Sequence, residues 1–201
     1  MLDTLSLFRL FPLIVAVLLA ACASAPTGPR DYGIPVEPGA FYYDVTGNSE
    51  FTLKESLSRE KAIYVPTGRF EGYTRWRLRW RYKFDESPGK CSLTEFTTEL
   101  IIQLFLPHWL KPADPDPDLE AKWSKYLLAL TEHEAGHVTI AQEAEAAVNS
   151  AAWRVYTARN CDELDRGLRI SINQVIQAYV ASSQTYDVAS QHGATQGVKF
   201  P

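Results

Sequence analysis

The chain has 201 residues, which is enough for one folded domain preceded by a short leader. Its composition, 46% hydrophobic and 22% charged, is ordinary for a globular protein. The net charge of -4 at pH 7 argues against general nucleic-acid binding, because proteins of that class carry a basic balance. We therefore expect no nucleic-acid partner.

The first residues have the features of a bacterial lipoprotein signal peptide, which we predict over residues 1–21. An apolar run that begins at Phe11 is too short for a membrane span and has the length of a signal-peptide core. It ends in Leu-Ala-Ala-Cys, so Cys22 is the predicted lipidation site, with an ordinary secretory signal as the alternative. Residues 22–40 are rich in proline and small residues, which is typical of a flexible tether.

This leader predicts an exported protein that a lipid anchors in the bacterial envelope. Ala23, rather than Asp, follows the predicted lipidated cysteine, which fits the outer membrane, facing the periplasm. The two remaining cysteines are Cys91 and Cys161. An even pair in an exported protein predicts a disulfide, and two buried free thiols are the alternative.

Three strands are predicted, at Phe41–Val45, Gly72–Phe84 and Cys91–Leu106. Each is rich in β-branched and aromatic residues, and Pro107 is expected to end the third. The turn residues Glu86–Gly89 connect the second and third strands. We expect these two strands to pair as an antiparallel hairpin.

Along the second predicted strand, apolar side chains alternate with cations. A period of two places one set on the core face and the other set on the opposite face. The core set is Trp76, Leu78, Trp80, Tyr82 and Phe84, and the opposite set is Arg75, Arg77, Arg79, Arg81 and Lys83. We interpret the cations as a solvated face, partly paired with Glu95 and Glu99 across the sheet. A surface that binds an anionic partner is the alternative.

Three helices follow from the spacing of apolar residues and from capping residues. They are predicted over residues 49–61, 119–159 and 163–182. Asp116 or Asp118 can cap the long central helix, and Asp162 is a candidate cap for the last one. Residues 185–201 are rich in Gly and Gln and are expected to form an irregular tail.

The long predicted helix carries the sequence His133-Glu134-Ala135-Gly136-His137. Glu134 and His137 fall on its apolar stripe, where burial without a partner would cost at least a few kcal/mol. His133 and His137 are one turn apart and can bind one Zn²⁺ through ring nitrogens. Glu134 would then lie beside the metal as the general base that activates water. The pattern predicts a zinc hydrolase, and the alternative is an exposed helix with scattered His and Glu.

Gly136 indicates close packing at this point of the predicted helix. Glycine inside a helix costs roughly 1 kcal/mol relative to alanine, so it usually has a packing reason. We expect another backbone, from a strand or from the C-terminal loop, to approach the helix closely at this residue.

Zinc needs a third protein ligand. The metzincin continuation of the motif is absent, because Ile140 and Glu143 stand where that continuation has glycine and histidine. Downstream, Glu163 and Asp165 are acidic candidates at a helix start. His192 lies in the predicted tail, where neighbouring glycines allow the chain to fold back. We predict His192 as the third ligand, with the acids as alternatives and an exposed tail histidine as the opposing interpretation.

From about Tyr42 to Pro201 the chain resembles the DUF922 family of bacterial proteins, described as predicted secreted zinc-dependent proteases. The resemblance rests on several pieces in the same order. They are Tyr42-Tyr43-Asp44-Val45-Thr46-Gly47, Trp76 and Trp80, Cys91, Leu106-Pro107-His108-Trp109, Trp123, Thr131 to His137, Cys161, Tyr186-Asp187, Gln191-His192-Gly193 and Gln196-Gly197.

The resemblance implies a zincin-like domain with the ligands His133, His137 and His192 and with Glu134 as the base. It further suggests Tyr186 as an oxyanion stabiliser and Asp187 as a residue that orients a ligand histidine. The alternatives are a core aromatic for Tyr186 and a turn former for Asp187.

We therefore expect an α+β, zincin-like domain over residues 41–201, with a small antiparallel sheet packed on the long motif-bearing helix and a second, C-terminal helix. The expected function is that of a zinc-dependent peptidase. Its substrate would be a peptide bond in an envelope protein or a peptidoglycan stem peptide. A catalytically inactive, metal-stabilised binding lipoprotein is the alternative.

Overall fold

The computed structural model describes residues 39–60, 63–65 and 68–200. The predicted signal peptide, the lipidation site Cys22 and the tether up to residue 38 lie outside these residues and stay predictions. Among the described residues, no helix combines the length and the apolar character that a membrane span requires.

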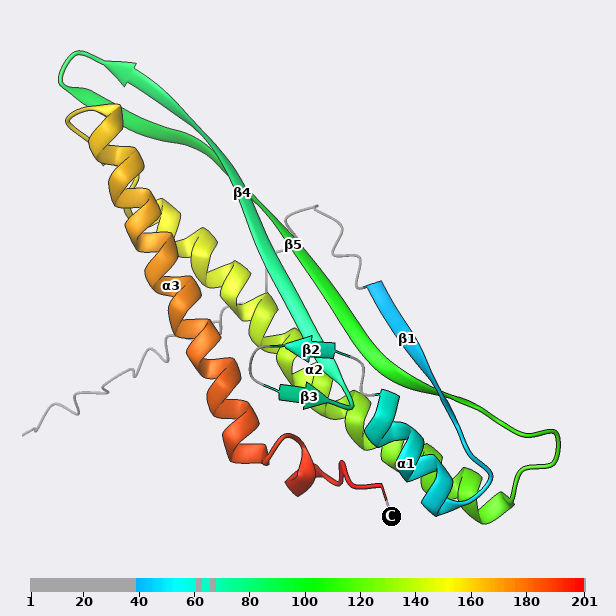
Figure 1. Cartoon of the computed structure of the whole chain (residues 1–201). Coiled ribbons are helices and arrows are strands. Elements are labelled where there is room, and N and C mark those ends of the chain that lie inside the picture. The colour runs from blue at the N-terminus through cyan, green and yellow to red at the C-terminus, as the bar shows by residue number, and fades with distance from the viewer. Residues whose placement is uncertain (1–38, 61–62, 66–67, 201) are drawn as a thin grey trace, which may run out of the picture.

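The fold belongs to the α+β class, as predicted, and two long strands and two long helices make up most of it. In chain order the elements are β1 (Gly39–Thr46), α1 (Glu50–Glu60), β2 (Ile63–Val65), β3 (Gly68–Phe70), β4 (Tyr73–Ser87), β5 (Lys90–Leu110), α2 (Pro117–Arg154), β6 (Thr157–Ala158), α3 (Cys161–Ser190) and the short 3₁₀ helix η1 (Ala194–Gln196). The β4–β5 hairpin extends along α2, and α3 runs back beside α2 (Figure 1). At 38 residues, α2 is about 57 Å long, so it spans most of the molecule.

The main sheet is mixed, which corrects the predicted antiparallel sheet. β4 pairs antiparallel with β5 as expected, from Tyr73 opposite Phe105 to Ser87 opposite Lys90. β1 instead pairs parallel with β5, with Phe41 opposite Phe105. The reason is the path of the chain. α1 and the β2–β3 hairpin return the chain from the end of β1 to the level of Phe105, where β4 begins in the opposite direction.

β5 continues through Pro107 to Leu110, although the proline was predicted to end it. Proline has no N–H, so it is tolerated where a strand is bonded on one side only. Pairing with β4 stops at Phe105, and β1 is the partner of β5 from there on. Pro107 therefore falls in a one-sided part of the strand.

The helix starts match the sequence better than the helix ends. Asp116 caps α2 by accepting a hydrogen bond from the amide of Asp118 at 2.9 Å, as one of the two predicted options. α2 ends at Arg154 rather than near residue 159, because the next residues form β6 and pair with the start of β5. α3 is capped by Asn160, not by Asp162, through a 2.9 Å bond from the amide of Glu163.

α3 extends to Ser190, well past its predicted end at residue 182. No glycine or proline interrupts these additional turns. The hydroxyls of Ser182, Thr185 and Ser190 donate to carbonyl oxygens one turn earlier, so these side chains have partners within the helix. Consequently Tyr186 and Asp187 lie on the last turns of a helix rather than in an irregular tail.

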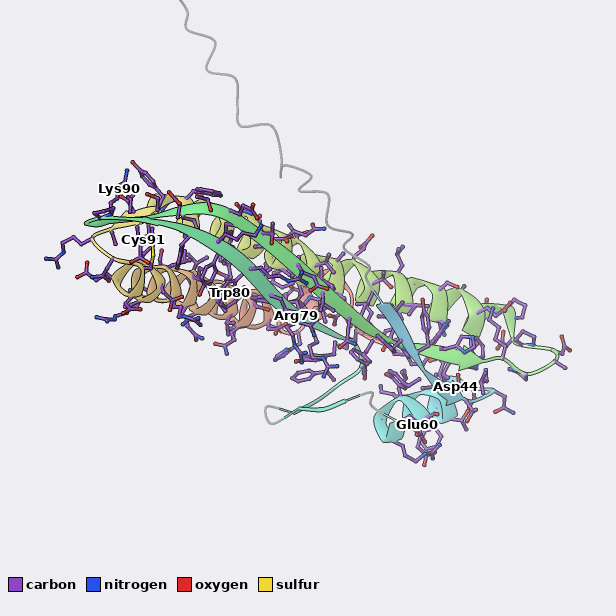
Figure 2. The ribbon with its side chains drawn as sticks, turned by 90° about the horizontal axis from the view of Figure 1, so that it is seen from above. Asp44, Glu60, Arg79, Trp80, Lys90 and Cys91 are labelled. Atoms are coloured by element: carbon purple, nitrogen blue, oxygen red, sulfur yellow. A yellow bond between two sulfur atoms is a disulfide. The ribbon has the colours of Figure 1, made fainter. Side chains whose placement is uncertain are left out.

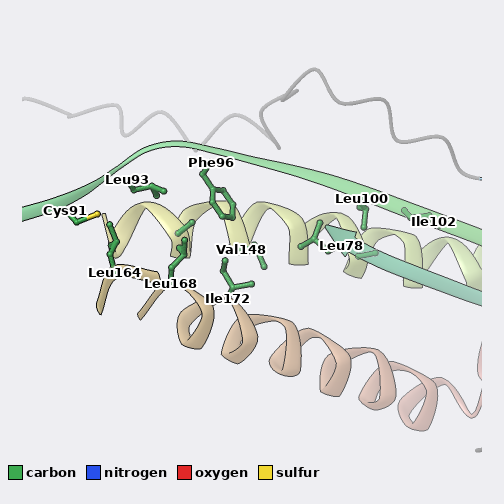
Figure 3. Close-up of a cluster of buried hydrophobic side chains, with 12 residues drawn as sticks. Leu78, Cys91, Leu93, Phe96, Leu100, Ile102, Val148, Leu164, Leu168 and Ile172 are labelled. Carbon is green, nitrogen blue, oxygen red and sulfur yellow. The ribbon is translucent and has the colours of Figure 1, made fainter. Parts of the chain in front are cut away.

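Two apolar clusters flank the middle of α2. The first lies between the hairpin, α2 and α3 (Figure 3) and consists of Leu78, Cys91, Leu93, Phe96, Leu100, Ile102, Ala141, Val148, Ala152, Leu164, Leu168 and Ile172. The second joins β1, α1 and the first half of α2 and consists of Val45, Leu53, Leu57, Leu106, Trp109, Leu119, Trp123, Tyr126, Leu130 and Phe200. On α2 the second cluster ends at Leu130 and the first begins at Ala141. The His-Glu-x-x-His turns occupy the interval between them.

The predicted disulfide between Cys91 and Cys161 is confirmed, with sulfur atoms 2.05 Å apart. It joins the start of β5, near the hairpin tip labelled at Lys90 and Cys91 in Figure 2, to the first residue of α3. The bond therefore ties the far end of the hairpin to the helix layer.

Replacing both cysteines with serine should lower the free energy of unfolding by about 4 kcal/mol, because the bond closes a loop with a sequence separation of 70 residues in the unfolded chain. Urea unfolding of the oxidised chain and of the double variant measures the difference. Dithiothreitol should destabilise the wild type and leave the double variant unchanged. Equal midpoints for the oxidised and reduced wild type would show that the bond does not contribute.

Candidate metal centre

Three ionisable side chains are buried in the middle of α2. His133, Glu134 and His137 have relative exposures of 3%, 3% and 7%. They continue the apolar stripe of α2 between Leu130 and Ala141, as the sequence predicted. Burial of this kind requires partners, because an unpaired polar group in the interior costs several kcal/mol.

Asp187, on the last turns of α3, is the partner that the two histidines share. Its Oδ1 lies 3.0 Å from Nε2 of His137 and 3.3 Å from Nε2 of His133. The three residues offer one ligand atom each, all within 4.8 Å of one another. Two atoms that share a tetrahedral zinc ion at its usual bond lengths lie about 3.3 Å apart. This donor set therefore fits a divalent metal ion such as zinc.

The other ring nitrogen of each histidine is held by a polar side chain. Nδ1 of His133 lies 2.8 Å from Oε1 of Gln196, and Nδ1 of His137 lies 2.8 Å from Oγ of Ser183. An amide oxygen can only accept, so Nδ1 of His133 carries a proton. Its Nε2 faces Asp187 and is the nitrogen that would bind an ion once it has given up its own proton. A partner at the far nitrogen is the arrangement by which proteins orient metal-binding histidines.

The electrostatics of the centre favour a charged carboxylate at Asp187. Burial alone would raise the pKa of Asp187, but hydrogen bonds from His133 and His137 outweigh it and hold that pKa well below its ordinary value. Burial would likewise lower the pKa of His133, yet the contacts with Asp187 and Gln196 leave it raised. Asp187 is thus available as an anionic ligand over the physiological pH range.

Glu134 lies beside the donor set without belonging to it. Its Oε2 accepts a 2.7 Å hydrogen bond from the hydroxyl of Thr74 on β4. Burial raises the pKa of Glu134, and the Thr74 bond and the two histidines oppose this effect. Gly72 makes the approach possible, because a Cβ there would lie 2.7 Å from Oε1 of Glu134.

The predicted third ligand, His192, lies near the centre but outside the donor set. Its Nδ1 is 3.7 Å from Oδ1 of Asp187, its side chain is 56% exposed, and its ring packs against Phe70 at 5.3 Å. Asp187 was expected to orient a ligand histidine, and the structure offers its carboxylate in the ligand position itself. Of the acidic alternatives, Asp165 bonds to Tyr82 and Arg169, and Glu163 to Arg159, so neither belongs to the donor set.

Tyr186 packs against both histidines. Its ring stacks on His133 at 5.0 Å and meets His137 edge-on at 5.0 Å. Its hydroxyl donates to the carbonyl of His133 at 3.2 Å and accepts from Nε2 of Gln196 at 3.0 Å. The hydroxyl thus points at the backbone of α2, and this geometry favours a positioning role over the oxyanion role that the sequence suggested.

Gly136 has the close neighbour that the sequence predicted, although the neighbour is a side chain. A Cβ at Gly136 would lie 2.4 Å from the hydroxyl oxygen of Tyr186 and 2.5 Å from its Cζ. The ring of Tyr186 therefore occupies the space that any other residue at position 136 would need.

A cavity of about 1280 Å³ opens over the centre, between β4, the middle of α2 and the second half of α3. The four residues His133, Glu134, His137 and Asp187 line it, and His192 lies at its wall. Every residue of β4 from Tyr73 to Leu78 also lines it. Side chains alternate between the two faces of a strand, so a wall of consecutive residues is formed by the main-chain edge of that strand.

Sequence reasoning missed Thr74, Ser183 and Gln196. Thr74 carries a usable signal, because it is a small polar residue at the start of a strand face that continues as Trp76 and Leu78. Ser183 lies four residues before Asp187 on the same side of α3, a relation that is visible only once the helix is known to continue. Gln196 has no local signal.

The comparison with protein families gives one match. The model of DUF922, described as a bacterial protein of unknown function, matches residues 41–193. The chain belongs to the DUF922 family. No curated protein and no solved structure matches the chain. The matched range contains the whole donor set and His192, and Gln196 lies just beyond it.

Asp187→Ala should lower the zinc affinity by more than about 100-fold, since even residues that only orient a ligand are worth 10–100-fold. His192→Ala is the matched variant and should retain one zinc per chain. Competition titration with a chromogenic chelator measures both constants. The reverse pattern, with zinc lost from His192→Ala and retained by Asp187→Ala, would restore His192 as the third ligand.

Gly136→Ala should destabilise the domain and weaken metal binding, because the new Cβ displaces Tyr186 from its place on both histidines. Gly167→Ala on α3 is the control. Its Cβ would meet only Val155 Cγ1, at 3.2 Å, so Val155 has to shift by a few tenths of an ångström and this offsets part of the helix-propensity gain of about 1 kcal/mol. The stability of Gly167→Ala should therefore stay close to that of the wild type. Thermal unfolding with and without zinc compares the two variants, and a gain in stability from Gly136→Ala would contradict the packing described.

Proposed function

We propose that this protein is a zinc-dependent peptidase with a zincin-like active site. One observation carries the proposal: a donor set of two buried histidines and the half-buried Asp187, with the buried Glu134 beside it, opens into a cavity whose wall is the free edge of a strand. A structural metal site, by contrast, is normally closed by four protein ligands.

Each residue of the centre has a distinct task in this proposal. His133, His137 and Asp187 would hold the ion, which when bound would supply Lewis acidity toward a carbonyl and toward water. Glu134 accepts the proton from the attacking water and delivers it to the leaving nitrogen. Thr74 fixes the carboxylate of Glu134 through its 2.7 Å hydrogen bond, so the base faces the cavity rather than rotating away.

The free edge of β4 favours a peptide as the substrate. β5 pairs with one edge of β4, and among the described residues no strand pairs with the other. An extended peptide can hydrogen-bond to such an edge as an added strand, and its scissile carbonyl would then lie over the residues of α2. A small compact substrate would leave the N–H and C=O groups along the free edge of β4 without hydrogen-bond partners.

The predicted leader supplies the location of this activity. A lipid on Cys22 and a tether over residues 22–40 would hold the domain at the membrane of the bacterial envelope, facing the periplasm. The peptide bonds available there belong to envelope proteins and to peptidoglycan stem peptides, and we propose the substrate among them.

The alternative is a metal-stabilised binding lipoprotein without turnover, and the position of His192 supports it. With Nδ1 at 3.7 Å from Oδ1 of Asp187, His192 is near enough to become a fourth protein ligand after a small rotation. A centre closed in this way would leave no coordination position for water or substrate.

Glu134→Gln separates the two functions. The variant should retain zinc and lose at least about 100-fold in hydrolysis of a mixed casein peptide digest, because it removes the general base and leaves the ligands in place. Glu132→Gln changes an exposed neighbour on the same helix and should hydrolyse at the wild-type rate. Mass spectrometry of the digest follows both. Equal activity of Glu134→Gln and wild type would contradict the peptidase proposal.

A further inference from the structure

The cavity extends along β4 beyond the metal centre. From Thr74, which contacts Glu134, it continues along β4 past Trp76 and Leu78 to Trp80. Six residues of strand correspond to about 20 Å. This long arm of the cavity, which we call the β4 groove, has room for several residues of an extended peptide.

The floor of the β4 groove is apolar. β4 contributes Trp76, Leu78 and Trp80, and α3 contributes Ile176 and Val180 from the opposite wall. Trp76, Trp80 and Ile176 are partly buried against the first apolar cluster, so the floor rests on a rigid core. Such a surface takes aliphatic or aromatic side chains.

The outer rim of the same groove is cationic. Arg75 and Arg77 line the cavity from the odd-numbered face of β4, whose cations are exposed, whereas Trp76, Leu78 and Trp80 on the even-numbered face are partly or fully buried. Within the part of the chain that the structure describes, the cations differ in their partners on β5. Arg79 lies 3.6 Å from Glu99, and Lys83 lies 2.8 Å from Glu95.

Arg77 has no such partner among the described residues. Its cross-strand neighbour on β5 is Ile101, an aliphatic side chain. Arg75 is bonded to the neutral side chain of Gln103. The positive charge at Arg77 is therefore unmatched on the β5 side, and its other side is the free edge of β4 that faces the cavity.

We propose that the β4 groove selects an extended peptide in which apolar and acidic side chains alternate. In an added strand, one set of side chains faces the floor at Trp76 and Trp80, and the other set lies beside Arg77 as a cross-strand neighbour. Opposite charges in that position attract and like charges repel. The inference rests on the proposed function and adds a substrate class and a specificity-determining residue to it.

Repeating peptides test this inference without knowledge of the binding register, because a shift by two residues preserves their pattern. Four fluorescein-labelled octapeptides, repeats of Leu-Glu, Leu-Gln, Leu-Lys and Ser-Glu, are titrated with the zinc-loaded full chain carrying Glu134→Gln, so that no turnover occurs. Fluorescence anisotropy gives the dissociation constants.

The Leu-Glu peptide should bind about three- to tenfold more tightly than Leu-Lys and Ser-Glu, a ratio typical of one partly exposed ion pair or one apolar contact. The charge preference should shrink as salt is raised. Equal affinities for Leu-Glu and Leu-Lys would overturn the acidic preference, and equal affinities for Leu-Glu and Ser-Glu would overturn the apolar one.

Two matched pairs of variants locate the effect, one that reverses a charge on β4 and one that introduces a charge on α3. Arg77→Glu should invert the preference to Leu-Lys, whereas Arg81→Glu should preserve it, because Arg81 shares the strand face but lies outside the groove lining. Val180→Glu should weaken the Leu peptides, whereas the exposed neighbour Ala181→Glu should not. The same shift from Arg77→Glu and Arg81→Glu would assign the preference to overall charge and overturn the proposed role of Arg77.

Cleavage by the zinc-loaded wild type keeps this inference distinct from the proposed function. Selective binding of Leu-Glu without its hydrolysis would refute the peptidase and support the β4 groove as a binding site. Hydrolysis of all four peptides at equal rates would support the peptidase and overturn the selectivity.

Discussion

Burial of charge on α2 is the constraint from which the rest of the structure follows. Two imidazoles and a carboxylate occupy the interval between two apolar clusters, at exposures of 7% or less. An uncompensated buried charge costs several kcal/mol, a large part of the stability of a domain. The fold must therefore bring polar partners to this one level of α2. Asp187, Thr74 and Gln196 arrive there from three different elements.

Close approach of these elements depends on small residues. Gly136 admits the ring of Tyr186, Gly72 admits the carboxylate of Glu134, and a Cβ at Gly193 would lie 2.9 Å from Cγ of His133. Gly193 also has a φ of 82°, which only glycine adopts without strain, and it turns the chain so that Gln196 reaches His133. The three glycines make room for three different side chains of the centre, Tyr186, Glu134 and His133, so the crowding belongs to the centre itself.

The sequence predicted the individual parts of this centre better than it predicted how those parts are arranged in space. The motif on α2, the hairpin and the disulfide follow from local spacing and from chemistry, and each is confirmed. The parallel pairing of β1 and the continuation of β5 through Pro107 depend on the path of the chain between strands, which no local pattern encodes. Nor is the continuation of α3 past residue 182 visible in the sequence, since these turns contain Ser and Thr, which are common at helix ends, and no glycine or proline. The position of this helix end decides which residue lies nearest the histidine pair. An irregular tail would allow His192 to reach the two histidines, whereas the longer α3 holds the carboxylate of Asp187 beside them.

An open strand edge above a buried site requires protection from the wrong partner. Unpaired edges invite pairing with another copy of the same chain, and proteins counter this with charged side chains along the edge. The cations of β4 have this effect, because two β4 edges side by side would bring like charges together. The same repulsion leaves the edge free for a strand of opposite charge. Protection from self-association and selection of an acidic partner would then be two results of one charge pattern, with the carboxylates of β5 neutralising only Arg79 and Lys83.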